Sequence, residues 1–185
     1  MTKTSSRAIV GIVMVASLTG GTPVRGQDAA EQQLGTVHFP TSCSQPAQQH
    51  FDRAMRYQHS FWYRKSREAF EQVLHADPTC AIAYWGIALS LLLNPHVPPP
   101  KDNLAPGLAA LQRGASLPTP TQRERDYIEA LLAFYRDHDT VPHASRVQHY
   151  LTALEALGQR YPADDEAQIG YAIMLNVAAS PNDKT

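Results

Sequence analysis

The sequence predicts an all-α fold, and three observations carry that prediction. Apolar residues recur at the three- and four-residue spacing of an amphipathic helix in seven stretches from residue 46 onward. No stretch alternates apolar and polar residues as a half-buried strand does. No Asn-Gly or Asp-Gly pair, a strong signal of a β-hairpin, occurs in the 185 residues. We therefore expect seven helices and no sheet.

The first three predicted helices span residues 46–59, 63–76 and 81–93. The first two carry an apolar stripe on one face, so each is expected to bury that side. The third is nearly all apolar, so we expect it to be buried on most sides. The stripe residues are Phe51, Ala54, Met55 and Tyr57 in the first helix and Ala69, Phe70, Val73 and Leu74 in the second.

The helix predicted over residues 104–117 is the weakest of the set, because Pro106 and Gly107 interrupt it. Two later stretches, residues 145–161 and 165–178, also show apolar residues at helical spacing. These two helices complete the prediction.

The fifth predicted helix, over residues 121–135, begins with a capping-box pattern. Thr121 and Glu124 are three residues apart, so the hydroxyl and the carboxylate are each placed to accept a hydrogen bond from a free amide at the helix start. This pattern predicts that the helix begins at Thr121.

The helices pair, and the pairs repeat along the chain. Pro78 and Pro162 each follow one helix and precede the next by a few residues. The segments after the two prolines are alike, since each opens a helix with small residues and a tyrosine. Self-similarity of a helix–turn–helix unit indicates a solenoid, in which each pair covers the apolar face of its neighbour.

Residues 47–80 form a 34-residue stretch that resembles a tetratricopeptide repeat. Small residues stand where helices would approach closely, large ones where they would fill the space between, and a proline ends the unit. A second unit begins at Ala81, a less regular third covers residues 127–162, and a fourth begins at Asp165. The resemblance implies a short right-handed solenoid of antiparallel helix–turn–helix repeats, about three and a half in number. The residues that carry the first repeat are Ala54, Tyr57, Ser66, Phe70 and Pro78.

Proteins of this family bind a peptide or a partner protein on the concave face formed by the first helix of each repeat. The residues that the resemblance places there are mostly apolar, so we expect an apolar or amphipathic protein segment as the partner. A second interpretation is that the groove is filled by the chain's own N-terminal arm or by later repeats. The predicted groove residues are Phe51, Met55, His59, Trp85, Leu89 and Leu92.

Cys43 and Cys80 are the two cysteines of the chain. Each precedes the first helix of a repeat, and in a solenoid of this kind those two helix starts are neighbours. We therefore predict a disulfide between them, with two unpaired thiols as the alternative. Their spacing matches neither a metal-binding knuckle nor a redox CxxC motif.

Residues 1–26 predict a secretory signal peptide. Basic residues precede an uncharged, mostly apolar run over 8–21, and small residues follow up to Gly26. This run is shorter than the roughly 20 residues that span a bilayer, so we expect cleavage and a periplasmic or secreted protein without a stable membrane anchor. The polar residues 27–43 predict a flexible or loosely docked arm. Residues 44–185 form the predicted repeat domain, which we expect to be truncated at its C-terminus.

The charge balance gives no sign of an anionic partner. The chain has 16 Lys and Arg against 17 Asp and Glu, a formal net charge of −1. The predicted signal peptide holds basic residues and no acidic ones, so the rest of the chain is more acidic still. We therefore expect no binding to nucleic acid or to an anionic membrane.

The sequence gives little support for catalysis or metal binding. It contains no GxSxG motif, and its eight histidines form no HExxH or HxH motif and no pair four residues apart. We expect a non-enzymatic protein without a metal or cofactor. The alternative hypothesis is a periplasmic metal- or cofactor-handling protein that uses His59, His96 and neighbouring histidines.

Aromatic residues gather around His59 in the predicted turn after the first helix. One interpretation is a platform for a ligand. The other is that Phe61 and Trp62 cover the turn while His59 caps the end of the helix, where a cation is favoured.

Overall fold

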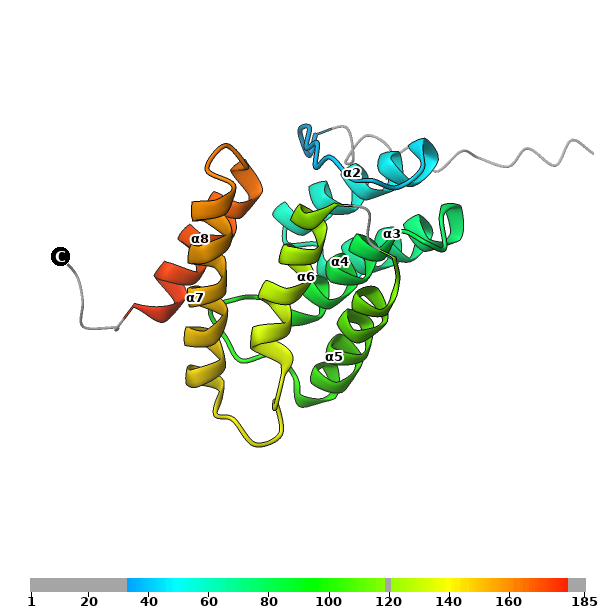
Figure 1. Ribbon diagram of the computed structural model, residues 1–185. Helices are drawn as coiled ribbons and strands as arrows, with labels where there is room; N and C mark the ends of the chain where they lie inside the picture. Colours follow the sequence, from blue (N-terminus) through cyan, green and yellow to red (C-terminus); the bar gives the residue numbers. More distant parts are fainter. Residues whose placement is uncertain (1–32, 119–120, 180–185) are drawn as a thin grey trace, which may run out of the picture. The chain divides into compact units, whose positions relative to one another are not determined.

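Seven α-helices make up the part of the chain that the structure, a computed structural model, describes: residues 33–118 and 121–179 (Figure 1). These residues contain no strand, so the all-α prediction is confirmed for them. The helices are α2 (Gln45–His59), α3 (Tyr63–Ala76), α4 (Ala81–Leu92), α5 (Lys101–Ser116), α6 (Gln122–Tyr135), α7 (His143–Arg160) and α8 (Asp165–Ala178).

The described helices belong to one compact unit, Leu34–Thr185. The predicted signal peptide, residues 1–26, lies outside the described residues. None of the helices that the structure describes is long and apolar enough to cross a membrane.

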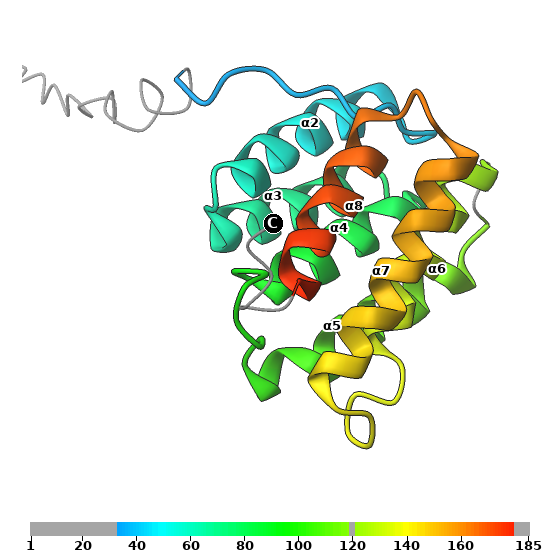
Figure 2. The same cartoon turned by 90° about the vertical axis from the view of Figure 1, so that its left-hand side faces the viewer.

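Helices that follow one another in the chain lie side by side (Figures 1 and 2). α2 packs on α3, α4 on α5 and α6 on α7, and α4 also packs on α2 and on α6. This arrangement is consistent with a helical repeat, in which each pair covers the apolar face of the next. α8 differs, because among the described helices its backbone packs on α7 alone.

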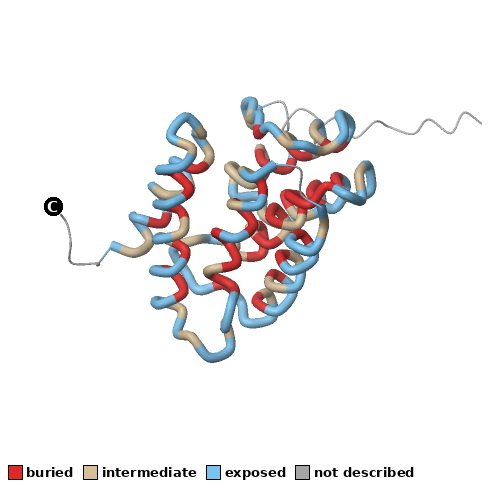
Figure 3. The backbone as a smooth tube through the Cα atoms, in the orientation of Figure 1, coloured by how far each residue is buried: buried red, intermediate tan, exposed pale blue. Residues whose placement is uncertain are grey.

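α4 lies at the centre of the core, as its apolar sequence predicts. Eight of its twelve residues are buried, and buried residues line the facing sides of its neighbours (Figure 3). Gly86 lets α4 approach α3 closely, because a Cβ at this position would overlap the ring of Phe70. A side chain there would have to displace a buried aromatic residue from a close-packed core.

α5 is continuous from Lys101 to Ser116, so the predicted interruption at Pro106 and Gly107 is wrong. Pro106 lies in the second turn, where its missing amide removes one hydrogen bond of the helix. Gly107 is needed for packing, because a Cβ there would overlap the ring of Tyr135 from α6. Packing between the two helices therefore outweighs the weak local helical pattern.

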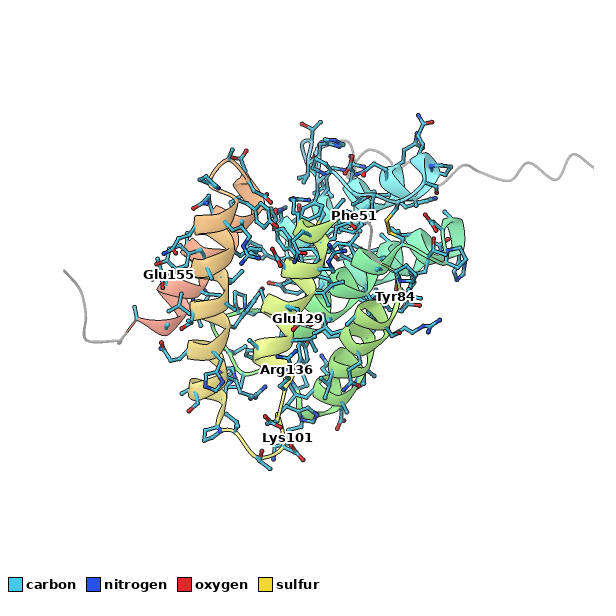
Figure 4. All side chains as sticks on the ribbon, in the orientation of Figure 1. Phe51, Tyr84, Lys101, Glu129, Arg136 and Glu155 are labelled. Carbon is cyan, nitrogen blue, oxygen red and sulfur yellow. A yellow bond between two sulfur atoms is a disulfide. The ribbon has the colours of Figure 1, made fainter. Side chains whose placement is uncertain are left out.

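The segment before α2 is part of the core. Phe39 is only 2% exposed, and Cys43 is bonded to Cys80, so the prediction of a flexible or loosely docked arm is wrong for residues 39–43 (Figure 4). The disulfide joins the residues that precede α2 and α4, which is the pairing predicted from the sequence. On a chain-entropy estimate, a crosslink between residues 37 positions apart stabilises the fold by about 3–4 kcal/mol.

Two glycine substitutions test how tightly α4 packs. Gly86→Ala is expected to lower the free energy of unfolding by about 1–3 kcal/mol, because the new methyl group meets the Phe70 ring. Gly170→Ala is the matched control: its Cβ would lie 3.5 Å from Leu154, an ordinary contact. Alanine favours a helix over glycine, so this control is expected to raise the free energy by up to about 1 kcal/mol. Urea unfolding measures both changes, and equal effects at the two positions would contradict the packing.

Candidate functional site

The six predicted groove residues fall into two groups. Phe51, Met55 and Trp85 lie in the core, with 0%, 0% and 3% of their surface exposed. The prediction that these three form an open groove is therefore wrong. The other three, His59, Leu89 and Leu92, are half-buried and line a cavity beside α8, and Trp85 also forms part of the wall of this cavity.

Phe39 closes the groove over its buried residues. Its ring stacks on Trp85 at 5.6 Å between centroids and lies 5.1 Å from Phe51 and 5.2 Å from Tyr127. The guanidinium of Arg123 covers the ring of Phe39 at 4.1 Å from its centroid. One residue of the arm thus contacts α2, α4 and α6 together, so the second interpretation, a groove filled by the chain itself, describes this region.

Side chains of α2 hold the backbone of the arm. The amide of Phe39 donates a hydrogen bond to Asp52 (3.1 Å), and its carbonyl accepts one from the Gln48 amide group (2.7 Å). The same Gln48 side chain accepts a hydrogen bond from the amide of Thr41 (2.8 Å). Because these backbone groups have partners, burying the segment leaves them satisfied.

Glu124 fixes the arm to the start of α6. The predicted capping box forms in part: the amide of Glu124 donates to the hydroxyl of Thr121 at 3.2 Å. The carboxylate of Glu124, however, accepts two hydrogen bonds of 2.6 Å from the amide and hydroxyl of Ser42. Glu124 is only 2% exposed, and these bonds compensate for the burial of its charge.

A cavity of about 180 Å³ lies between α4 and α8. Its walls come from α2, α3, α4, α6, α7 and α8 and from the turns that follow α2 and α4, and most of the wall surface is apolar. The space exists because α8 packs on α7 and its backbone does not reach α6. The apolar wall residues that we use below are Trp85, Leu89, Leu92, Leu154, Ile173 and Met174.

An ion pair forms part of the wall of this cavity. Nε2 of His59, the last residue of α2, lies 2.9 Å from Oε2 of Glu166 in the first turn of α8. The hydrogen bond to Glu166 raises the pKa of His59, and burial opposes that rise. A cation at the end of one helix and an anion at the start of another are also favoured by the helix dipoles.

Asp164 ties the α7–α8 turn to α6. It accepts hydrogen bonds from Nε of Arg123 (2.6 Å) and from the hydroxyl of Tyr127 (2.9 Å). Burial alone would raise the pKa of Asp164, but the hydrogen bonds from Arg123 and Tyr127 outweigh it and hold the pKa below its ordinary value. The start of α8 is thus held by two polar contacts, at Asp164 and at Glu166.

Tyr150 contributes a polar group to the cavity wall. It is 5% exposed, and its hydroxyl makes no hydrogen bond with another described residue. Burial, followed by the negative charge of Glu166, raises the pKa of Tyr150, so the hydroxyl stays protonated.

The turn between α2 and α3 forms part of the cavity's rim. Phe61 is 71% exposed and has a φ of 62°, in the left-handed region that bulky residues avoid at a cost of about 1–2 kcal/mol. Trp62 stacks on Tyr57 at 5.9 Å and covers the end of α2, as the second interpretation of this turn expects. The ring of Phe61 lies 6.3 Å from that of Tyr63 and stays largely exposed, so its strained position points to a role outside the core.

The metal hypothesis gains no site from this arrangement. Among the described residues, no group of three or more His, Cys, Asp or Glu side chains lies close enough together to hold a metal ion. His59 has a carboxylate partner in Glu166, whereas His96 is exposed and does not line the cavity.

Sequence reasoning missed Phe39, Tyr150 and Glu166. Phe39 stands in a polar stretch without helical spacing, and Tyr150 belongs to an ordinary helical stripe. The helix dipole favours acidic residues at the start of α8, which accounts for Asp165 but gives no reason for the bond between Glu166 and His59. No local signal distinguishes these residues, because their partners are distant in sequence.

His59→Gln tests the pair with Glu166 through its pH dependence. Because folding raises the pKa of His59 above its ordinary 6.5, the pair stabilises the fold fully at lower pH and loses this effect as the pH rises through the raised pKa. The stability difference between wild type and His59→Gln is therefore expected to be larger at about pH 5.5 than at about pH 8. Urea unfolding at both pH values measures it, and a difference that does not change with pH would contradict the pair.

Comparisons with known proteins identify no relative of this chain. No protein-family model matches the sequence, no curated protein matches it, and no solved structure matches its fold.

Proposed function

We propose that this chain is an exported, non-enzymatic helical-repeat module of the tetratricopeptide type, which binds a segment of a partner protein. The binding site is the cavity between α4 and α8 together with its rim at Phe61 and Ile173. The observation that carries the proposal is the combination of an apolar cavity with large exposed apolar side chains beside it. An interface of this kind has a buried anchor at its centre and apolar contacts around it.

The exposure of the rim supports a macromolecular partner. Phe61 is 71% exposed and Ile173 is 40% exposed, and both line the cavity. Large apolar side chains next to a concave site are typical of surfaces that another protein covers. The strained backbone of Phe61 adds to this argument, since a glycine there would relieve the strain and remove the side chain from the rim.

The disulfide between Cys43 and Cys80 supports export. Disulfides form and persist in oxidising compartments such as the bacterial periplasm and the extracellular space, and they are rare in the cytosol. Together with the predicted signal peptide over residues 1–26, this favours a partner that is itself periplasmic, secreted or exposed on the cell surface.

Phe61→Gly separates binding from stability. Glycine adopts a positive φ without the steric cost that a bulky residue has. Phe61→Gly is therefore expected to raise the free energy of unfolding by about 1 kcal/mol. The same change is expected to weaken partner binding about tenfold or more, because it deletes an exposed aromatic contact at the rim. A photo-crosslinking amino acid at position 61, introduced in the exporting host, first identifies the partner. Titration of that purified partner then compares wild type with Phe61→Gly.

The control position is Glu155, which is exposed on α7 and does not line the cavity (Figure 4). The same crosslinker at position 155 is expected to give no specific product. If positions 61 and 155 react alike in a chain whose circular dichroism shows it folded, the proposed function is wrong. If the Phe61→Gly variant binds the partner as tightly as wild type does, the interface lies elsewhere and not at the rim.

A further inference from the structure

We infer that the arm presents a free strand edge at Thr36 and His38, and that an extended segment of the partner protein adds to this edge through backbone hydrogen bonds. The inference rests on the proposed function and names the way in which the partner segment is held. Its basis is the alternating hydrogen-bond pattern of the arm, which has partners on both sides near α2 and lacks them on one side further back.

Successive residues of the arm direct their backbone groups to opposite sides. The amides of Phe39 and Thr41 donate to side chains of α2, and the carbonyl of Phe39 accepts from another such side chain. The carbonyl of Pro40 accepts a hydrogen bond of 2.9 Å from the first turn of α6, and the amide of Ser42 donates one of 2.6 Å to the same turn. An alternation with a period of two is the geometry of an extended strand (Figure 2).

The same alternation fixes the direction of the backbone groups of Thr36 and His38. Counted back from Pro40 in steps of two, they face the side of α6, and both residues line a cleft of about 990 Å³ there, which we call the arm cleft. Neither residue forms a backbone hydrogen bond with another described residue. The extended stretch begins after Gly35, whose φ of 72° turns the chain. Two amides and two carbonyls therefore form a short unpaired edge in the arm cleft.

The arm cleft has a second wall, which an added segment would contact. This wall is made of residues 160–166, at the α7–α8 turn, and of Ile169 in α8, and most of the surface of the arm cleft is apolar. A strand added to the edge would lie about 4.8 Å from the arm, with side chains that alternate between its two faces. Every second side chain of the added segment can then pack on the apolar surface.

The edge selects a peptide backbone as its occupant. Donors and acceptors alternate along it, and an extended chain supplies the complementary series at the same spacing. An unpaired edge of this kind is a template for pairing with another chain. A second copy of this protein is disfavoured, because its arm is held in its own core by Phe39 and by the disulfide at Cys43. The occupant is therefore an extended segment of a different protein.

The arm cleft continues the site proposed above. His59 and Glu166 line both the arm cleft and the cavity between α4 and α8. One extended segment that passes this ion pair can place a side chain in the cavity and pair its backbone with Thr36 and His38. The segment that crosslinks at position 61 is therefore expected to be the one that adds to the arm.

Hydrogen exchange, read at single amides by NMR, tests the edge. In the purified chain we expect the amides of Thr36 and His38 to exchange fast and those of Phe39 and Thr41 to exchange slowly. The probe is a synthetic peptide with the sequence of the segment that crosslinks at position 61. At saturation the exchange of Thr36 and His38 is expected to slow at least about tenfold, while Phe39 and Thr41 change little.

Two results of this measurement would overturn the inference. One is slow exchange of Thr36 and His38 before the peptide is added, because the chain itself would then cover the edge. The other is exchange at these two amides that stays the same when the chain is saturated with the peptide.

A pair of variants at position 38 separates the backbone from the side chain. His38→Pro removes the amide on the edge, whereas His38→Ala, the matched control, keeps that amide and loses the same side chain with its bond to Asp52. Proline suits an extended conformation, and the side chain of His38 is 66% exposed, so both variants are expected to fold. Circular dichroism and mapping of the disulfide check the fold.

His38→Pro is expected to bind the peptide about three- to tenfold more weakly than His38→Ala, the change expected for one lost hydrogen bond. Equal binding by the two folded variants would contradict the strand edge. If position 61 crosslinks a partner but neither exchange nor His38→Pro shows the expected change, the inference is wrong and the proposed function stands. If no partner crosslinks at position 61, the proposed function fails and the inference fails with it.

Discussion

The burial of Phe39 is the contact on which the rest of this structure depends. One ring from a short polar segment meets Phe51 on α2, Trp85 on α4 and Tyr127 on α6, so it joins three helices that are far apart in the sequence. The disulfide from Cys43 to Cys80 secures the same segment a few residues later. The surface over Phe51 and Trp85 is thereby converted into core, and the cavity beside α8 is the site where we propose that a partner binds.

The elements of the fold could be predicted because they follow from local pattern. Seven stretches with apolar residues at helical spacing correspond to the seven helices of the described residues, and Thr121 caps α6 as its spacing predicts. Local pattern was misleading at Pro106 and Gly107, where contact with Tyr135 keeps α5 continuous. Repetition along the chain also predicted the pairing of Cys43 with Cys80, because the first helices of two successive repeats begin side by side. The family resemblance itself remains a prediction.

The site could be predicted only in part, for a physical reason. His59, Trp85, Leu89 and Leu92 do line the cavity, but Phe51 and Met55 are fully buried. Phe39 packs on Phe51 and Trp85, and an apolar position on a helix does not reveal what covers it. Glu166 meets His59 because of the placement of α8, which packs on α7 and leaves a space beside α4. That placement is a tertiary property. It brings Glu166 to His59, although the two residues are 107 positions apart in the sequence.

Hydrogen exchange at the backbone amides of Phe39, Thr41 and Ser42 is the most direct test of the account. These amides donate to Asp52, Gln48 and Glu124, and two of the three acceptor side chains belong to α2. If the arm is part of the core, the three amides will exchange slowly, with protection similar to that of the amides within α2. Exchange at the rate of an unstructured peptide, while α2 stays protected, would contradict the account, because the groove would then be open and Phe51, Met55 and Trp85 would be available to a partner.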